Sequence, residues 1–404
     1  MWEQIRSNQI RTIVLVAGMG LMLLVIGYFA GLYFFDSGPS GIIIALIVWM
    51  VMNMVAFFQG DGILLALSRA KKIKRDDHPR LYNIVEEMKI ASGLPRMPDI
   101  YIIDDPALNA FAIGRDPDKA SVAITSGLLN KLSRDELQGV IAHELAHIKN
   151  RDVLLMTMTA VLLGTIVILA FFASRFMIFG SMGGTRRSSS AGGGQIQVII
   201  FIVAIVLMIL APILAQLIYF AISRKREYMA DASSALYTRY PEGLASALEK
   251  LSASTSQLKS ASKATAPMYI INPFRKKGRA AANLSSTHPP ISERVHILRQ
   301  MAGGASFADY DHAYQQVHKA GGGIISAPTI AVTGAVGLRA AKAETKGKDP
   351  DRLARTRETE DLLWRQSNYK TITCSCGTKL KIPPKFKESS VKCPHCGKVH
   401  GLSK

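Results

Sequence analysis

The chain has 404 residues, 49% of them hydrophobic, with a positive mean hydropathy of +0.18, and this length allows two or three domains of about 150 residues each. All four cysteines lie near the C-terminal end, which excludes a secreted disulfide framework because the rest of the chain contains no partner for them. The net charge is +19, and the stretch from Lys370 to Lys404 contributes +7 of it, because eight lysines there accompany the single acid Glu388.

Four segments are long and apolar enough to cross a bilayer, which takes about 20 helical residues. They run from Thr12 to Phe35, from Gly41 to about Phe58 with an apolar continuation to Leu67, from Val153 to about Ala173, and from Ile196 to Ile222. The first is much longer than a signal-peptide core and has no small-residue cleavage site after it, so we expect an uncleaved membrane anchor. This composition excludes an ordinary soluble enzyme.

Basic residues beside these segments predict their orientation, because positively charged loops stay on the cytoplasmic side. Five lysines and arginines follow the second segment between residues 69 and 75, and three more follow the fourth at 224–226. The turn 36–40 carries none, while Arg186 and Arg187 in the loop 181–195 are a contrary signal. We therefore expect a multi-pass protein of a bacterial or archaeal inner or cell membrane, with both termini and residues 68–152 in the cytoplasm.

The segments outside the membrane predict helices and short strands. Residues 79–91 have the apolar spacing of an amphipathic helix, and the patterns at 99–103 and 121–125 predict strands. Ser133 and Glu136 form a capping box for a helix that runs to about Asn150. Beyond residue 223 the chain is mostly helical to about 301, and a low-complexity linker at 321–348 leads to a charged helix near 351–367.

His143-Glu144-Leu145-Ala146-His147 lies within the capped helix and is the most informative motif in the chain. Positions four apart share a helical face, so both imidazoles can bind one zinc ion. Glu144 then lies where it can act as general base on a zinc-bound water that attacks a peptide carbonyl. The alternative is a pair of polar histidines on a helix face with no metal.

A catalytic zinc ion usually has three protein ligands and one open position. Glu227, in Arg226-Glu227-Tyr228-Met229-Ala230-Asp231, is the candidate for the third ligand. Asp231, one helical turn on, can orient a ligand histidine through a hydrogen bond. Two predicted membrane segments separate His147 from Glu227, and this even number returns the chain to the same side of the membrane. A solvated acidic pair that balances the neighbouring basic residues is the alternative.

The order of these motifs, with Asn109-Ala110-Phe111-Ala112 before the histidines, resembles the HtpX-type membrane zinc endopeptidases, relatives of the CAAX prenyl proteases, over about residues 1–300. The resemblance implies His143, His147 and Glu227 as zinc ligands and Glu144 as catalytic base. It also implies that the strand around Asn109, Ala110, Phe111 and Ala112 binds the substrate backbone as an added strand. It suggests a role in proteolytic quality control of misfolded membrane proteins.

His288-Pro289-Pro290 with Arg294 is similar to the His-Pro…Arg segment that follows the third ligand in this family. Either side chain, His288 or Arg294, could stabilise the oxyanion of the tetrahedral intermediate. A helix-start turn set by the two prolines is the alternative. The remaining histidines outside the tail, His78, His296, His312 and His318, are expected at the surface.

The tail contains two knuckle-like cysteine pairs, Cys374-Ser375-Cys376 and Cys393-Pro394-His395-Cys396, with sixteen residues between them. Four thiolates predict a structural zinc site, since a polar segment of about 35 residues needs a metal to fold. The short first spacing leaves His395 or His400 open as a substitute ligand, and free or redox-active thiols are the alternative. The nearby lysines could contact nucleic acid, anionic lipid or an acidic protein, although few aromatic residues are present for stacking on single strands.

Together these features predict a mainly α integral membrane protein with four transmembrane helices, a zincin-like α+β metalloprotease domain of the gluzincin type with a small β-sheet, and a C-terminal zinc ribbon. We expect one catalytic and one structural Zn²⁺, and unfolded or misfolded membrane proteins and the lipid bilayer as partners. The predicted divisions are 1–67 and 153–222 for two transmembrane hairpins, 68–152 and 223–302 for the metalloprotease domain, 303–369 for a linker, and 370–404 for the ribbon. A catalytically silent scaffold with structural zinc sites and a partner-recruiting ribbon is the alternative, and a prenyl-protein protease is a third interpretation.

Overall fold

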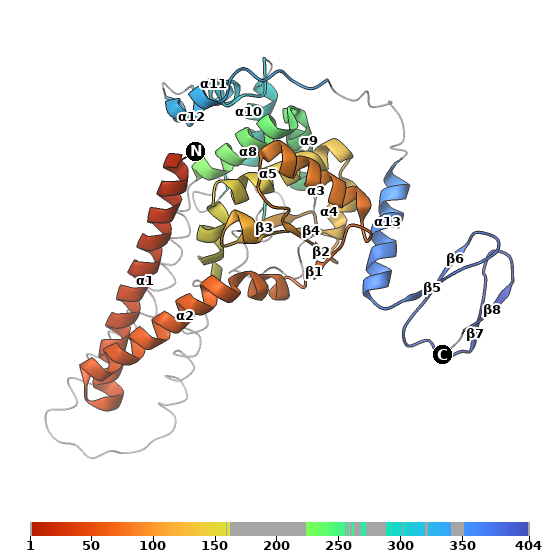
Figure 1. Cartoon of the computed structure of the whole chain (residues 1–404), viewed down its shortest axis with the longest axis horizontal. Coiled ribbons are helices and arrows are strands. Elements are labelled where there is room, and N and C mark those ends of the chain that lie inside the picture. Colours follow the sequence, from red (N-terminus) through yellow and green to blue (C-terminus); the bar gives the residue numbers. More distant parts are fainter. Residues whose placement is uncertain are drawn as a thin grey trace.

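The computed structural model describes residues 2–158, 160–161, 224–254, 256, 258, 261, 268–271, 288–301, 303–319, 322–340 and 351–402. Figure 1 shows a long helical hairpin, α1 (Trp2–Phe35) and α2 (Gly38–Leu67), extending away from a body that contains a β-sheet and the helices α3, α5, α8 and α9. The C-terminal strands, coloured blue, lie on the other side of the body in this view.

The hairpin consists of the two described helices that are long and apolar enough to cross a membrane, over Asn8–Phe29 and Gly38–Leu67. Its helices approach closely at glycines: a Cβ atom on Gly41 would lie 2.0 Å from the carbonyl oxygen of Gly27. Large apolar side chains along both helices are exposed, which suits a lipid-facing surface. The first two predicted membrane segments are therefore helical, whereas the third beyond residue 161 and the whole of the fourth lie outside the described residues.

A four-stranded sheet in the order β1-β2-β4-β3 lies in the middle of the body. Its strands are β1 (Lys71–Lys72), β2 (Asp99–Ile103), β3 (Ala110–Gly114) and β4 (Ala120–Thr125). β2 runs parallel to β4, whereas β3 runs antiparallel to β4 and places Ala112 opposite Val122. The strands predicted at 99–103 and 121–125 are confirmed, and β3 forms one edge of the sheet.

The two faces of the sheet pack against different parts of the molecule, because successive side chains of a strand point to opposite faces. On one face Ala112 belongs to the main core, together with α3 (Pro79–Ser92) and α5 (Arg134–Lys149). On the other face Phe111 packs in a cluster with Leu64, near the end of α2. The sheet thus joins α5 on one side to the base of the apolar helical hairpin on the other.

Helix α5 begins at the predicted capping box, in which the Ser133 hydroxyl and the Glu136 carboxylate each accept the other residue's backbone N–H, at 3.3 and 2.8 Å. Every residue from Glu136 to Ile148 is buried. α5 packs against α8 (Arg224–Thr238) and α9 (Pro241–Ala253). A Cβ atom on Gly139 would lie only 2.7 Å from the backbone nitrogen of Leu244, so glycine is required where α5 meets α9.

The remaining described helices are α4 (Ser126–Lys131), a 3-10 turn (Pro117–Lys119), α10 (Ile291–Gln300), α11 (Phe307–His318), α12 (Ala327–Val332) and α13 (Asp351–Gln366). The charged helix predicted near 351–367 is confirmed as α13. The structure departs from the predicted linker at α11, where Phe307 and Tyr310 are buried in the main core. Apolar residues three or four apart give this helix a face that folds onto the body.

The C-terminal region consists of two antiparallel hairpins, β5 (Lys370–Thr373) with β6 (Lys379–Ile382) and β7 (Ser390–Lys392) with β8 (Val399–Gly401). Each turn carries one cysteine pair followed by a glycine with positive φ, 83° at Gly377 and 78° at Gly397. The apolar cluster that these hairpins share is very small, and two of its buried members are Cys374 and Cys393. The predicted domain boundaries stay a prediction.

Candidate metal centre

Helices α5 and α8 bring three potential metal ligands to one point. His143 and His147 lie four residues apart on α5, and their Nε2 atoms are 3.2 Å from each other. Glu227, on α8, places one carboxylate oxygen 3.7 Å from Nε2 of His143 and the other 3.7 Å from Nε2 of His147. One ligand atom from each residue lies within 4.8 Å of the others, and all three side chains are buried.

These distances fit a shared ion. Ligand atoms about 2.1 Å from a tetrahedral zinc ion are about 3.4 Å from one another, close to the 3.2 and 3.7 Å seen here. Buried Oε2 of Glu227 accepts no hydrogen bond from any described residue. A buried carboxylate oxygen that lacks a hydrogen-bond donor and lies 3.7 Å from Nε2 of His143 is suited to bind a cation.

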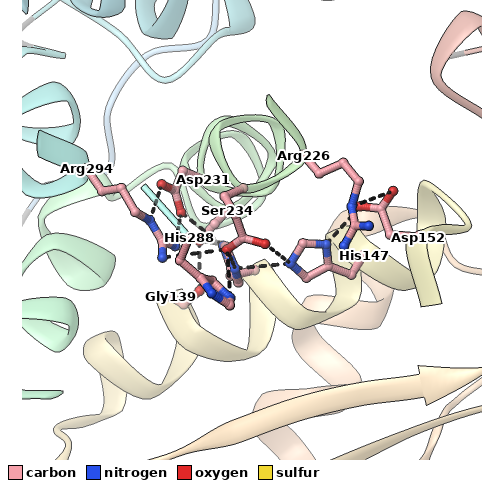
Figure 2. A network of polar contacts seen from close by, with 10 residues as sticks. Gly139, His147, Asp152, Arg226, Asp231, Ser234, His288 and Arg294 are labelled. Carbon is pink, nitrogen blue, oxygen red and sulfur yellow. Dashed lines mark hydrogen bonds and ion pairs between the residues drawn. The ribbon is translucent and has the colours of Figure 1, made fainter. Parts of the chain in front are cut away.

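The other ring nitrogen of His143 faces Asp231. Its Nδ1 lies 3.0 Å from Oδ1 of Asp231, and Arg294 donates two hydrogen bonds to the same carboxylate, from Nε at 2.8 Å and from Nη2 at 2.6 Å. Figure 2 shows Arg294 and Asp231 meeting in this paired arrangement beside His288. Asp231 thus occupies the orienting position expected of it.

His147 has a corresponding carboxylate, Asp152, which the sequence analysis missed. Nδ1 of His147 lies 2.8 Å from Oδ2 of Asp152, and the side chain of Arg226 approaches the other oxygen at 3.6 Å. Both contacts are visible in Figure 2. An acidic residue five positions after the second histidine was a usable signal, but it lies directly before the third predicted membrane segment. The hydrogen bond from Asn8 to Asp152, at 2.5 Å across 144 positions, has no local signal.

Electrostatics favour charged carboxylates at both acidic positions on α8. Burial raises the pKa of Asp231, but Arg294 and His143 outweigh burial and hold this pKa below its ordinary value. Burial likewise raises the pKa of Glu227, and the imidazoles of His288, His143 and His147 outweigh it, so the pKa of Glu227 lies well below the ordinary range. A carboxylate that is ionised at neutral pH is ready to bind a cation.

The pKa of Glu144 is raised, in contrast to those of Asp231 and Glu227. Glu144 is buried beside the two histidines, and burial raises its pKa against the opposing effect of the imidazoles of His143 and His147. The backbone amide of Ala112, on β3, also interacts with its carboxylate. A carboxylate with a raised pKa next to a metal position and an edge strand is suited to accept a proton from water.

The four predicted substrate-binding residues, Asn109 to Ala112, lie at this edge, but part of it is already covered. The carbonyl oxygen of Ala110 accepts a hydrogen bond from the backbone N–H of Ile270 at 3.1 Å. The side-chain amide of Asn109 donates to the carbonyl oxygen of Ile271 at 3.0 Å. The rings of Phe111 and Tyr269 meet edge to face, 5.1 Å apart. The segment Met268–Ile271 therefore lies along β3 where an added strand is expected.

The two predicted oxyanion candidates both approach Glu227. Nε2 of His288 and Nη1 of Arg294 each lie 3.7 Å from Oε2 of Glu227. Arg294 is fully buried, and its Nε and Nη2 atoms are used on Asp231. This geometry favours a positioning role for Arg294, and the oxyanion role of His288 stays a prediction.

The tail forms a second metal-competent group, made by the four cysteine sulfur atoms at Cys374, Cys376, Cys393 and Cys396. Sγ of Cys374 lies 3.4 Å from Sγ of Cys396, and Sγ of Cys376 lies 3.7 Å from Sγ of Cys393. Thiolates about 2.3 Å from a tetrahedral zinc ion are about 3.8 Å apart, whereas a disulfide needs about 2.05 Å. The group consists of sulfur alone, without His395 or His400, and it is consistent with the predicted zinc ribbon.

Comparison with known proteins agrees with this chemistry. Residues 75–302 match the sequence profile of peptidase family M48. A protease HtpX homolog from Dictyoglomus turgidum is 45% identical over 300 residues, which cover 74% of this chain and 94% of that protein. The Streptococcus mutans homolog is 42% identical over 301 residues, covering 74% of this chain and 100% of that protein. Among solved structures, Ste24p of S. mikatae matches 73% of this chain and 66% of its own, at 20% identity and a TM-score of 0.37.

Proposed function

Because this chain belongs to peptidase family M48 and is a metalloprotease, we propose that it is a membrane-embedded zinc endopeptidase acting at the cytoplasmic face of the inner or cell membrane. The single observation that carries the proposal is the convergence of His143, His147 and Glu227 on one point, with Glu144 beside them at the edge of β3. Family membership favours the enzyme over the catalytically silent scaffold.

His143, His147 and Glu227 would hold the zinc ion. When bound, zinc supplies a water of lowered pKa and polarises the scissile carbonyl. Glu144 takes the proton of the attacking water and returns it to the leaving amine, which its raised pKa favours at neutral pH. Asp231 and Asp152 keep a proton on Nδ1 of each ligand histidine, so that each Nε2 presents its lone pair.

An extended substrate would be held by the backbone of β3. The backbone groups of Ala110 and Ala112 both lie on the edge of this strand that faces away from β4. The backbone amide of Ala112 reaches Glu144 there. A peptide added to this edge has its carbonyl groups close to the general base. Because main-chain hydrogen bonds provide the contact, a broad range of unfolded sequences fits, which supports misfolded membrane proteins as substrates in quality control.

The two apolar helices support a position at the membrane, because Leu64 and Leu65 of α2 pack under the sheet that carries β3. The basic residues that follow α2 support the cytoplasmic orientation. The bilayer is thus a proposed partner, and so are the unfolded membrane proteins that reach its surface.

Replacing Glu144 with Gln tests the mechanism. We expect cleavage of unfolded casein in detergent to fall by at least about a hundredfold, because Gln cannot accept the proton. Zinc content measured by elemental analysis should stay at two ions per chain, since Glu144 is not a ligand. Glu86→Gln is the matched control, because Glu86 forms a surface ion pair with Arg75 at 3.5 Å and should leave cleavage unchanged.

Two further variants assign the metals. His143→Ala should lose the zinc ion of the hydrolytic site, and Cys393→Ser should lose that of the tail. The proposal fails if Glu144→Gln still cleaves casein, or if His143→Ala keeps both ions.

A further inference from the structure

Asn8 is a buried polar residue in the first membrane helix. It lies at the start of the apolar stretch Asn8–Phe29, and its side chain is only 3% exposed. Burying an amide is unfavourable unless its hydrogen bonds are made. Both hydrogen bonds that its Nδ2 makes run to the chain just after α5, more than 140 positions away.

The first of these hydrogen bonds is made to Asp152, the carboxylate that orients the proposed metal ligand His147. Nδ2 of Asn8 donates to Oδ1 of Asp152 at 2.5 Å, and Oδ2 of the same carboxylate lies 2.8 Å from Nδ1 of His147. Asp152 is itself 1% exposed. A buried carboxylate needs donors at both oxygens to keep one orientation, and Asn8 and His147 supply them on opposite sides.

The second hydrogen bond is made to the C-terminal end of α5, the helix that carries His143 and His147. Nδ2 of Asn8 also donates to the carbonyl oxygen of Asn150 at 3.3 Å, and Asn150 is the C-cap residue of α5. Asn8 therefore holds both the helix that carries His147 and the carboxylate that orients its ring. The two carboxylates behind the histidines are supported differently: Asp231 accepts two hydrogen bonds from Arg294, whereas Asp152 accepts one from the Asn8 amide and has Nε of Arg226 3.6 Å from the same oxygen.

We propose that Asn8 is a positioning residue for the metal centre, acting through Asp152 on His147. The first membrane helix is then part of the support of the hydrolytic site and not only an anchor. The amide holds the Asp152 carboxylate in the orientation that meets Nδ1 of His147, which leaves Nε2 of that ring for the metal. This inference rests on the metal site of the proposed function.

The experiment compares Asn8→Leu and Asn8→Ala with the unchanged full-length protein in detergent. Zn²⁺ affinity is measured by competition with a chelator, and His143→Ala identifies the ion that belongs to this site. We expect the affinity to fall about tenfold in both variants, as for other residues that support a ligand histidine. Leu has the branched skeleton of Asn but is larger, and Ala is smaller, so a loss of affinity shared by both variants follows from the missing amide and not from a change of volume.

Asn53→Leu is the matched control, because among the described residues the amide nitrogen of Asn53 bonds within α2, to the carbonyl oxygen of Trp49 at 2.8 Å. Its Zn²⁺ affinity should equal that of the parent. Thermal unfolding of the metal-free proteins shows whether each variant folds. Asn8 variants that keep the parental affinity would overturn this inference alone, even if they unfold at a lower temperature. A parent that binds no zinc at His143 would overturn the proposed function with it.

Discussion

The guanidinium of Arg294 donates two hydrogen bonds to Asp231, the carboxylate behind the proposed ligand His143. It is fully buried, and its fork matches the carboxylate with two short hydrogen bonds. Asp152 has the same position behind His147 that Asp231 has behind His143, and it accepts its hydrogen bond from Asn8. Both carboxylates serve the ring nitrogen that points away from the ligand cluster, so the geometry of the site depends on residues that do not touch the ion.

Replacing Arg294 with Lys keeps the charge and removes the fork. We expect the free energy of unfolding to fall by about 1–3 kcal/mol, since buried donors and acceptors lose partners, and Zn²⁺ affinity to fall about tenfold. Arg299→Lys is the matched control, because Arg299 makes similar paired bonds to Glu242 and Glu249 at the surface and should cost less than about 1 kcal/mol. Equal losses in both variants, measured by denaturation in detergent, would contradict this account.

At the scale of elements, the proposed approach of substrate to Glu144 depends on β3 and the segment Met268–Ile271 beside it. The segment uses the carbonyl oxygen of Ala110 and the amide of Asn109 at the edge where we propose that substrate pairs. A substrate that needs the same groups must displace it. Displacement reduces the apparent affinity for substrate by the fraction of molecules in which the edge is free.

Ile270→Pro removes the N–H that bonds to Ala110. Losing a hydrogen bond worth about 1 kcal/mol should lower KM about fivefold, while kcat stays unchanged. Ile270→Val keeps the N–H and should behave as the parent. Steady-state cleavage of a fluorogenic peptide separates the two constants, and a higher KM with a lower kcat would show instead that the segment is a fixed wall of the cleft.

At the scale of the whole molecule, α13 connects the cysteine hairpins to the body. His78 was expected at the surface, but it is 1% exposed, and its Nδ1 accepts the N–H of Leu81 at the start of α3. Its ring lies between this helix and α13, with Nδ1 3.3 Å from a carboxylate oxygen of Glu358 and Nε2 3.4 Å from the hydroxyl of Thr359. The expectation was wrong because α13, some 280 positions away, covers the histidine.

This burial makes the attachment of α13 sensitive to acid. Burial holds the pKa of His78 below its ordinary value of 6.5, and the opposing charge of Glu358 does not reverse the shift. The unfolded chain therefore takes up a proton more readily than the folded one, so stability is lost as pH falls through 6.5. Thermal unfolding between pH 7.5 and 5.5 should show a larger decrease for the parent than for His78→Asn, which keeps the capping acceptor and cannot titrate. Equal decreases would contradict this role.

Local sequence patterns were sufficient to predict several of the helices and strands. The capping box at Ser133 predicted the start of α5, and apolar patterns predicted α3, β2 and the long apolar helices α1 and α2, because these signals act within a few turns or strand residues. The pair His143 and His147 with Glu144 between them predicted metal chemistry for the same reason, since helical geometry alone brings them together.

Short-range spacing was thus enough to predict a zinc peptidase, because His143, Glu144 and His147 lie within about one helical turn and need no distant contact to meet. The long-range contacts came from the folded chain alone: Asn8 behind Asp152, α13 over His78, and Met268–Ile271 along β3. These contacts join residues more than 140 positions apart, and no short-range periodicity or spacing encodes which distant side chain satisfies a buried polar group.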